Sequence, residues 1–287
     1  MMEFVEGVKA KETLGIAQIL EGSYEGKKIR MNGAVHNVRD MGEVAFVILR
    51  KAEGLVQCVY EEGVTNFDIH DLKEESAVEV LGTVKAEERA PHGFEIRLEE
   101  IKVLSQPAEP MPIPISKWKM NTSLETKLAL RPVSLRNVRE RAKFKIQEGI
   151  VRGFREALQK EGFTEIHSPK IVAQNAEGGA NLFKLDYFGQ PAYLAQSPQF
   201  HKQYLAGTFG RVFEIGSVYR AERHNTSRHL NEYIGLDFEM AYIDSMYDVM
   251  AMETGMLKAV MAYVKEHCAE ELALLKADVP EIREIPT

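Results

Sequence analysis

The sequence predicts an α+β protein with two structured domains: a small five-stranded barrel, and then an antiparallel sheet flanked by helices. Residues 27–105 alternate apolar and polar side chains with the period of two that strands require. Residues 137–162 instead repeat apolar side chains at helical spacing, and four prolines in eight residues separate the two patterns. A chain of 287 residues is long enough for two cores, because single cores stop growing at roughly 250–300 residues.

The first pattern contains five strand-like segments, which are KKIRMNGAVHNV, VAFVILR, GLVQCVY, AVEVLGTVKA and FEIRLEEIKVL. Turn-rich segments separate them, except that NFDIHDLKEESA, between the third and fourth, indicates a short helix. Five strands with a helix after the third is the order of an OB-fold, whose exposed face and loops often bind single-stranded oligonucleotides. Another small barrel or a sandwich would give a similar pattern, so that alternative stays open.

The domain boundaries follow from these patterns. Residues 1–105 form the predicted barrel domain, and the proline-rich residues 106–136 form an extended linker or hinge. The second domain, 137–287, begins with a long amphipathic helix that ends at Gly162, where a C-terminal cap belongs. From residue 244 to about 276 the period is again helical.

Composition limits the partners and the compartment. The net charge of −7 gives no global attraction to nucleic acid, so a polyanion would have to meet a local basic surface. Cys58 and Cys268 have no metal-ligand spacing and suggest no disulfide framework. No stretch approaches the roughly 18 apolar residues of a membrane span, which predicts a cytoplasmic protein without membrane contact.

Two segments of the second domain concentrate polar side chains. In QSPQFHKQ, Ser197, Gln199 and Lys202 follow an apolar run, where a strand that runs into a helix would form a ligand site or merely a solvated turn. The second segment is a predicted hairpin whose strands end at Tyr219 and restart near Tyr233. Its loop carries Arg220, Glu222, Arg223, His224, Arg228 and His229.

The hairpin loop suits a polyphosphate, because guanidinium groups bind phosphate oxygens bidentately and stabilise the charge that develops in phosphoryl or nucleotidyl transfer. A surface hairpin with paired charges is the alternative. The sequence contains no GxxxxGK[ST] motif, so a Walker-type loop is not expected to bind the phosphates.

These segments together resemble the class II aminoacyl-tRNA synthetases. EGFTEIHSPKI, residues 161–171, resembles motif one, and FEIGSVYRAERHNTSRHLNEYIGLDFEM, residues 213–240, resembles motif two. A preceding OB-fold is the layout of subclass IIb, and AEGGANLF, YFGQPAYLAQSPQFHKQ and RHNTSRHLNEY are similar to the aspartyl-tRNA synthetases of the archaeal and eukaryotic type. The asparaginyl enzymes and a non-catalytic, regulatory tRNA-binding protein that reuses synthetase parts are the alternatives.

The resemblance implies an activity and its partners. With ATP and Mg²⁺, the enzyme would convert L-aspartate to aspartyl-adenylate and then transfer the aspartyl group to the 3′ end of tRNA. A homodimer would form through motif one, at Gly162 and Pro169. Lys202 favours aspartate over asparagine, because an ammonium group pairs with a carboxylate and leaves an amide poorly satisfied.

The family's motifs place individual roles on residues of this chain. The aspartate site would be lined by Glu177, Ser197, Gln199, Lys202 and Asp237, and the catalytic and ATP-binding residues would be Arg220, Glu222 and His229, with Tyr233 stacking on adenine. The anticodon contacts would be Phe46, Gln57 and Glu95, although Phe46 lies in an apolar run and could be a core aromatic.

The sequence departs from the family in one respect. A GxGxER-like motif three, the family's Mg²⁺-binding glutamate and the arginine that clamps the aspartate side chain are absent from the 287 residues, so no metal ligand is predicted in this chain. We therefore expect a truncated form that binds tRNA but activates aspartate poorly. The small Ala34 in the barrel bears on whether tRNA(Asp) alone, or also tRNA(Asn), is the substrate.

Overall fold

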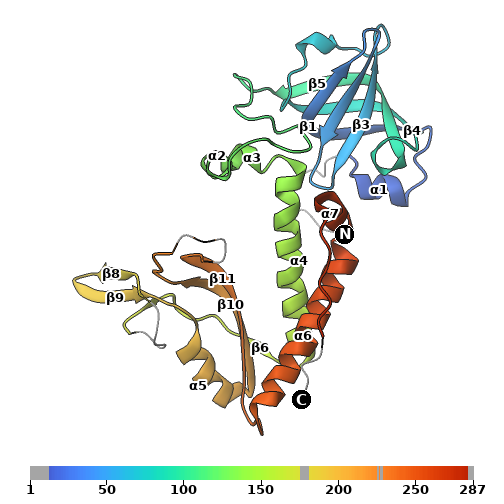
Figure 1. Cartoon of the computed structure of the whole chain (residues 1–287). Coiled ribbons are helices and arrows are strands. Elements are labelled where there is room, and N and C mark those ends of the chain that lie inside the picture. The colour runs from blue at the N-terminus through green and yellow to red at the C-terminus, as the bar shows by residue number, and fades with distance from the viewer. Residues whose placement is uncertain (1–12, 175–180, 225, 227–228, 284–287) are drawn as a thin grey trace, which may run out of the picture. The chain divides into compact units, whose positions relative to one another are not determined.

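The computed structural model describes residues 13–174, 181–224, 226 and 229–283 (Figure 1). The chain divides into two compact units, Met1–Arg141 and Ala142–Thr287. Over the described residues, no helix is both long enough and apolar enough to cross a membrane.

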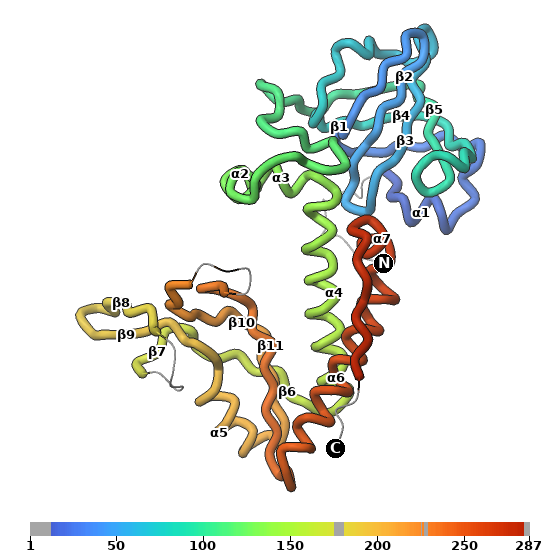
Figure 2. Tube along the Cα trace, viewed as in Figure 1, coloured from blue at the N-terminus to red at the C-terminus, as the bar shows by residue number. Residues whose placement is uncertain are grey.

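The first unit contains a closed five-stranded barrel. Its strands are β1 (Lys28–Asp40), β2 (Val44–Arg50), β3 (Leu55–Glu61), β4 (Ala77–Ala86) and β5 (Phe94–Ser105). They close in the order β1-β2-β3-β5-β4. Figure 2 labels the five strands along the trace of the chain. Only β3 and β5 pair in parallel among these strands. The OB-fold prediction, including all five strands, is confirmed.

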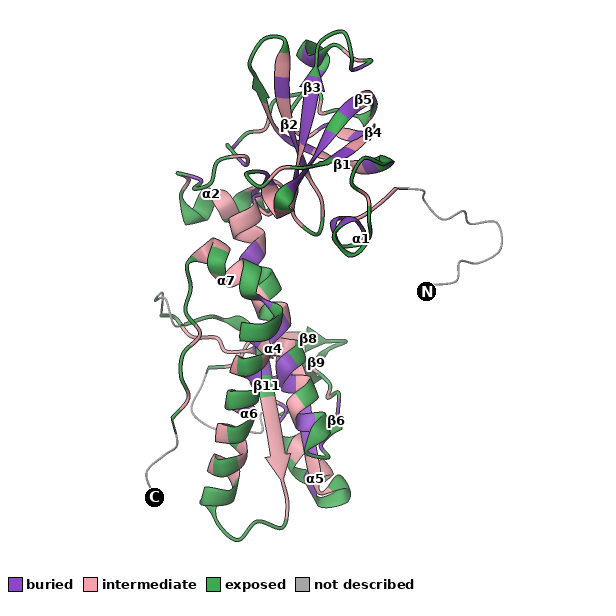
Figure 3. Cartoon of the chain, turned by 90° about the vertical axis from the view of Figure 1, so that its right-hand side faces the viewer, coloured by how far each residue is buried: buried purple, intermediate pink, exposed green. Residues whose placement is uncertain are grey.

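Alternation along the strands separates the barrel core from its outer face. In β2, Ala45, Val47 and Leu49 are completely buried, whereas Phe46 is only half-buried and does not belong to the core cluster. Because successive side chains of a strand point to opposite faces, Phe46 lies on the outer face. The buried stripes of the barrel appear in purple in Figure 3.

Short helical segments complete the barrel. Helix α1 (Ile16–Glu21), which the sequence analysis did not predict, packs Ile16 and Ile19 into the barrel core. The helix predicted after the third strand is a single 3₁₀ turn, η1 (Ile69–Asp71), where the Asp68 side chain accepts a hydrogen bond from His70 N at 3.0 Å. A second 3₁₀ turn, η2 (Pro91–Gly93), precedes β5.

The segment between β5 and the long helix is more structured than the predicted linker. It contains α2 (Leu124–Ala129) and α3 (Arg131–Ser134), and Ile113, Ile115 and Met120 form a small buried cluster. The Asn137 side chain donates to the carbonyls of Ile115 (2.9 Å) and Lys117 (2.8 Å). Its oxygen accepts from Arg139 N and Glu140 N and so caps the next helix.

The second unit is built on helices and two small sheets. Its elements are α4 (Val138–Lys160), β6 (Thr164–Glu165), β7 (Ile171–Val172), β8 (Lys184–Tyr187), β9 (Gln190–Leu194), α5 (Gln199–Phe209), β10 (Arg211–Tyr219), β11 (Glu232–Met240), α6 (Met246–His267) and α7 (Ala269–Leu275). The sheet orders are β11-β10-β6 and β7-β9-β8. Helix α4 starts within the first unit.

Helices α4 and α6 pack against one face of β10 and β11. Phe154 and Leu158 of α4, Phe213 of β10 and Val260 of α6 belong to one buried cluster. After α4, Gly162 adopts φ +78°, a left-handed conformation suited to the predicted helix end. The predicted C-terminal helical region consists of two helices, because the chain leaves α6 at Cys268 and restarts as α7.

Candidate functional site

The other face of β10 and β11 carries the polar residues of the second unit. Glu214 pairs in register with Asp237, and Gly216 pairs with Gly235. A Cβ atom at Gly235 would lie 2.9 Å from Asp237 Oδ2, and one at Gly216 would lie 3.0 Å from Glu214 Oε1. The paired glycines form a floor that neighbouring side chains cover: Glu214 and Lys170 lie over Gly216, and Asp237 and Val218 lie over Gly235.

Arg220 and Tyr233 lie at the end of this floor. The Arg220 guanidinium is 6.0 Å from the centre of the Tyr233 ring, and Arg220 N donates to Asn231 O at 2.9 Å. Arg220 Nε is buried and finds no acceptor among the described residues. A buried donor without an acceptor is costly in a folded protein, which makes this atom suited to an anionic ligand.

Glu222 and His229 are brought together by the hairpin loop. His229 Nε2 lies 3.5 Å from Glu222 Oε2, and His229 Nδ1 lies 2.6 Å from Thr226 Oγ1. The ring of His229 also packs on His224, with ring centres 5.3 Å apart. Of the predicted loop residues, Arg228 lies outside the described residues.

Lys202 reaches from α5 to the floor of β11. Its Nζ lies 3.1 Å from Asp237 Oδ1 and 3.6 Å from Glu239 Oε2, and its side chain is only 13% exposed. Two carboxylates thus surround one ammonium group, so the local charge is negative.

The other residues predicted to bind the amino acid lie at the start of α5. Gln199 begins the helix, and Ser197 Oγ accepts a hydrogen bond from Gln199 N at 3.1 Å. Glu177, the predicted partner of the substrate ammonium group, lies outside the described residues.

Glu214 is a polar residue of this face that the sequence analysis missed. It is 3% exposed, and its carboxylate accepts hydrogen bonds from Ser168 N (3.0 Å), Ser168 Oγ (3.1 Å) and Lys170 Nζ. It therefore fastens the segment around Pro169 to β10. The available signal was a charge inside the apolar run VFEIG, since a buried carboxylate needs partners.

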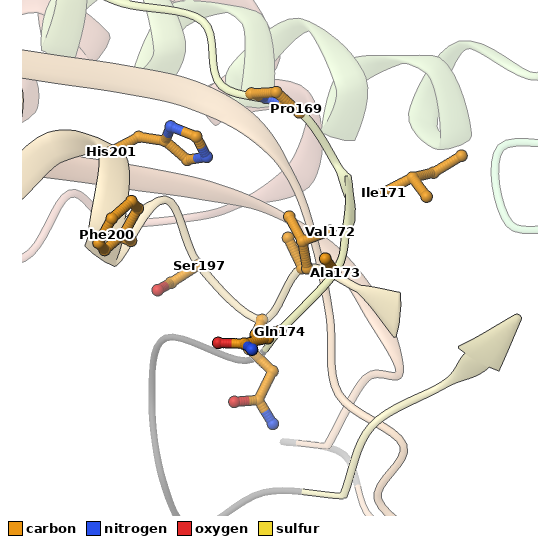
Figure 4. A pocket seen from close by; sticks show the side chains of 10 residues that line it. Pro169, Ile171, Val172, Ala173, Gln174, Ser197, Phe200 and His201 are labelled. Carbon is orange, nitrogen blue, oxygen red and sulfur yellow. The ribbon is translucent and has the colours of Figure 1, made fainter. Parts of the chain in front are cut away.

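A pocket of about 410 Å³ opens where that segment meets α5 (Figure 4). Pro169, Ile171, Ser197, Phe200 and His201 are among its lining residues. Ile171 is 50% exposed and Phe200 64%. The pocket therefore continues into an exposed apolar surface.

The predicted anticodon residues lie on the outer face of the barrel. Phe46 pairs in register with Val59, and Gln57 pairs with both Ile48 and Glu95. The Arg39 guanidinium lies 5.6 Å from the centre of the Phe46 ring. Glu95 is 4% exposed and less accessible than a direct base contact would suggest.

Comparison with known proteins defines the class. Residues 123–286 match the family described as tRNA synthetases class II (D, K and N), and residues 29–104 match the OB-fold nucleic acid binding domain family. The chain belongs to the class II tRNA synthetases of the D, K and N group.

Within this class, the chain is similar in sequence to aspartate–tRNA ligases. The chain is 48% identical over 259 residues to an aspartate–tRNA(Asp/Asn) ligase of Deinococcus radiodurans and 41% identical over 261 residues to an aspartate–tRNA(Asp) ligase of Pyrococcus abyssi. These matches cover 90% and 89% of this chain but only 58% and 59% of the relatives. The chain thus spans about three fifths of the length of the curated relatives it matches.

A solved structure shows the same fold. The asparaginyl-tRNA synthetase of Pyrococcus horikoshii complexed with asparaginyl-adenylate superposes with a TM-score of 0.81 at 33% identity, and the match covers 89% of this chain and 59% of that one. The predicted resemblance to the synthetase family is confirmed.

Proposed function

We propose that this chain carries the anticodon-binding barrel and the motif one and motif two portion of the catalytic domain of an aspartate–tRNA ligase. In this proposal residues 1–105 bind the anticodon, 106–136 act as a hinge and 137–287 belong to the catalytic domain. The enzyme works in the cytoplasm, where the two buried free thiols, Cys58 and Cys268, stay reduced.

The position of Lys202 is the observation that supports aspartate as the substrate. Its ammonium group lies against Asp237 and Glu239 of β11, with Ser197 and Gln199 nearby at the start of α5. A third carboxylate would add to the negative charge there, so the substrate carboxylate would take the place of Asp237 or Glu239 beside the ammonium group of Lys202. An asparagine amide would leave the ammonium group with a weaker partner. Glu177 is proposed to receive the substrate's own ammonium group.

The glycine floor and Arg220 fit a nucleotide. The glycine pair Gly216 and Gly235 lies next to Tyr233, whose ring can stack on adenine. The unsatisfied Arg220 Nε supplies a donor for the α-phosphate. Glu222 and His229 would contact the acceptor end and the γ-phosphate.

Mg²⁺ bound together with ATP would neutralise part of the charge on the phosphates. Among the described residues, no group of three or more His, Cys, Asp or Glu side chains could hold a metal ion.

The proposed reaction has two steps. An aspartate carboxylate oxygen attacks the α-phosphorus of ATP, and the bond to pyrophosphate breaks. The terminal ribose hydroxyl of tRNA then attacks the activated carbonyl carbon, and AMP leaves. Arg220 would stabilise charge on the α-phosphate, and positioning by the surrounding side chains supplies most of the remaining rate enhancement.

The barrel face would hold the anticodon. Phe46 presents a half-buried ring on the outer face, on which a base can stack. Gln57 lies on β3 two residues from Val59, the residue that pairs with Phe46. Its amide can hydrogen-bond to a base edge. Stacking on one such aromatic side chain contributes about 1–3 kcal/mol.

We also propose a homodimer through motif one. Pro169 lines the pocket next to exposed apolar side chains, with Ile171 50%, Phe200 64% and Tyr204 51% exposed. A contiguous apolar surface of this kind favours burial against another protein surface. Gly162 directs the chain from α4 into the segment that leads to Pro169.

The test is calorimetric binding of two non-hydrolysable adenylate analogues, aspartyl- and asparaginyl-sulfamoyl adenosine. The proposal expects at least tenfold tighter binding of the aspartyl analogue, and loss of that preference in Lys202→Met. Tighter binding of the asparaginyl analogue would favour an asparaginyl enzyme. If the chain bound tRNA but neither analogue, that result would favour a regulatory tRNA-binding protein.

A further inference from the structure

Glu95 is a buried carboxylate in the middle of the barrel face that is proposed to bind RNA. Its Oε2 accepts a hydrogen bond from Gln57 Nε2 at 3.1 Å, and its Oε1 forms an ion pair with Arg97 Nη2 at 2.8 Å. Its side chain is 5% exposed, whereas that of Arg97 is 51% exposed. Both oxygens are therefore committed to neighbouring side chains, and those neighbours are better placed than Glu95 to meet a ligand.

The register of β2, β3 and β5 places Arg97 in the same cross-strand row as Phe46, the aromatic side chain that is proposed to stack on a base. Phe46 pairs with Val59 across β2 and β3, and Val59 pairs with Arg97 across β3 and β5. Neighbouring strands lie about 4.8 Å apart, so the backbones of Phe46 and Arg97 are roughly 10 Å apart. The long side chain of Arg97 can close much of that distance. A strand of RNA that stacks one base on Phe46 would bring its next nucleotide within reach of Arg97.

The hydrogen bond between Gln57 and Glu95 fixes the orientation of an amide. Because Gln57 Nε2 donates to Glu95, the amide oxygen of Gln57 is left to accept from a ligand. A rotated amide would place its oxygen against the carboxylate, where the two acceptors repel each other. Glu95 therefore decides which group Gln57 offers to a base.

We propose that Glu95 is a positioning residue that acts through Gln57 and Arg97, and that Arg97 binds the phosphate of the nucleotide next to the base stacked on Phe46. This inference rests on the proposed function of the barrel as an anticodon-binding domain. The guanidinium of Arg97 has five N–H donors, and its Nη2 forms the ion pair with Glu95. The remaining donors match the oxygens of a phosphate.

Arg97 is tested by fluorescence anisotropy with a labelled anticodon stem-loop RNA over a range of salt concentrations. Arg97→Ala is expected to weaken binding about 5- to 30-fold and to lower the slope of log K against log salt by about one, because one phosphate contact is lost. The matched control is Arg89→Ala, which removes the same charge from another arginine–glutamate pair of this unit. An affinity within twofold of wild type, or the same loss in both variants, would overturn the role of Arg97.

The role of Glu95 is tested by whether the effect of Glu95→Gln on RNA affinity requires Gln57 and Arg97. Glu95→Gln is expected to weaken binding at least fivefold in the wild-type chain but less than twofold in a chain that already carries Gln57→Ala and Arg97→Ala. An equal loss in both backgrounds would mean that Glu95 contacts RNA directly or acts through the fold, and the positioning role would be wrong. The control is Glu99→Gln, which breaks the ion pair between Lys28 and another glutamate of β5. Urea midpoints show whether each variant keeps its fold.

The same series separates this inference from the proposed function. Unchanged affinity in both Phe46→Ala and Gln57→Ala, or no RNA binding by the wild-type chain, would overturn the anticodon face and this inference with it. A loss in Phe46→Ala together with full affinity in Arg97→Ala would overturn only the role of Arg97.

Discussion

Lys202 and Asp237 form an ion pair at 3.1 Å that joins the first turn of α5 to the middle of β11. The two residues are 35 positions apart in the chain. Glu239 lies 3.6 Å from the same ammonium group, so Lys202 is the shared partner of two carboxylates. This arrangement makes Lys202 important for stability as well as for the proposed substrate.

The first prediction concerns the charge balance around this ion pair. Lys202→Met should destabilise the second unit by about 2 kcal/mol, because it leaves Asp237 and Glu239 facing each other without a cation. Adding Asp237→Asn should recover part of that loss, which a double-mutant cycle in urea measures. Lys265→Met, an exposed change on α6, is the control and should stay within about 0.5 kcal/mol of wild type. A double variant no more stable than Lys202→Met would contradict this account.

The second prediction concerns Glu214. Glu214→Gln keeps the shape of the side chain but removes the charge that holds Lys170, and its amide nitrogen would face the donors of Ser168. We expect a loss of about 2–4 kcal/mol in the free energy of unfolding. Equilibrium urea denaturation checks it, with Glu253→Gln on the exposed side of α6 as the control. Equal stability in the two variants would show that the Glu214 contacts contribute little.

The third prediction concerns the glycines between α4 and α6. A Cβ atom at Gly153 would lie 2.9 Å from Tyr263 Cβ and 3.2 Å from Val260 Cα, so Gly153→Ala must push the helices apart. We expect a loss of about 1–3 kcal/mol. At Gly255 of α6 an added Cβ meets no atom within 4 Å, so Gly255→Ala should instead stabilise by about 0.5–1 kcal/mol through helix propensity. The midpoint of thermal unfolding should therefore fall below the wild-type value in Gly153→Ala and rise above it in Gly255→Ala. Shifts of the same sign in both variants would contradict this prediction.

The fourth prediction concerns pH and the ionic network of the first unit. His36 Nδ1 lies 3.3 Å from Arg50 Nη1, Arg50 pairs with Glu75, and Glu75 Oε2 lies 2.9 Å from Arg136. Burial, and then the charge of Arg50, hold the pKa of His36 below 6.5, although Glu75 opposes and Arg141 reinforces this shift.

The sign of the effect follows from the lowered pKa. As pH falls below about 6.5, the unfolded chain takes up a proton that the folded His36 resists, so the stability present above pH 6.5 is progressively lost. His36→Gln should flatten this fall between pH 6.5 and 5. Trp118, the single tryptophan, lies in this unit and reports its urea midpoint by fluorescence. A wild-type slope in His36→Gln would contradict the prediction.

Glu75 extends the pH dependence to lower pH. Burial alone would raise the pKa of its carboxyl, but hydrogen bonds and charges from Arg50 and Arg136 outweigh burial and hold the pKa below 4.5. The stability it contributes is therefore complete above about pH 4.5 and is lost as pH falls through the lower folded value. In Glu75→Gln the loss below pH 4.5 should be smaller, at the cost of lower stability at neutral pH.

The sequence alone determined the elements whose signals are local. Alternation along residues 27–105 predicted the five barrel strands, and the predicted hairpin strands end at Tyr219 and restart within one residue of Glu232, where β11 begins. The family motifs placed candidate residues on this chain before any contact was known. Periodicity and turn residues act over a few positions, which is why they can be recognised without the fold.

Only the tertiary structure decided which side chains meet. It joins Lys202 to Asp237, fastens Ser168 and Lys170 to Glu214, and buries Glu95 between Gln57 and Arg97. It also turned the predicted linker into a segment with its own small core and two short helices. These contacts depend on strand register and on the packing of distant segments, and a single sequence carries no local signal for either.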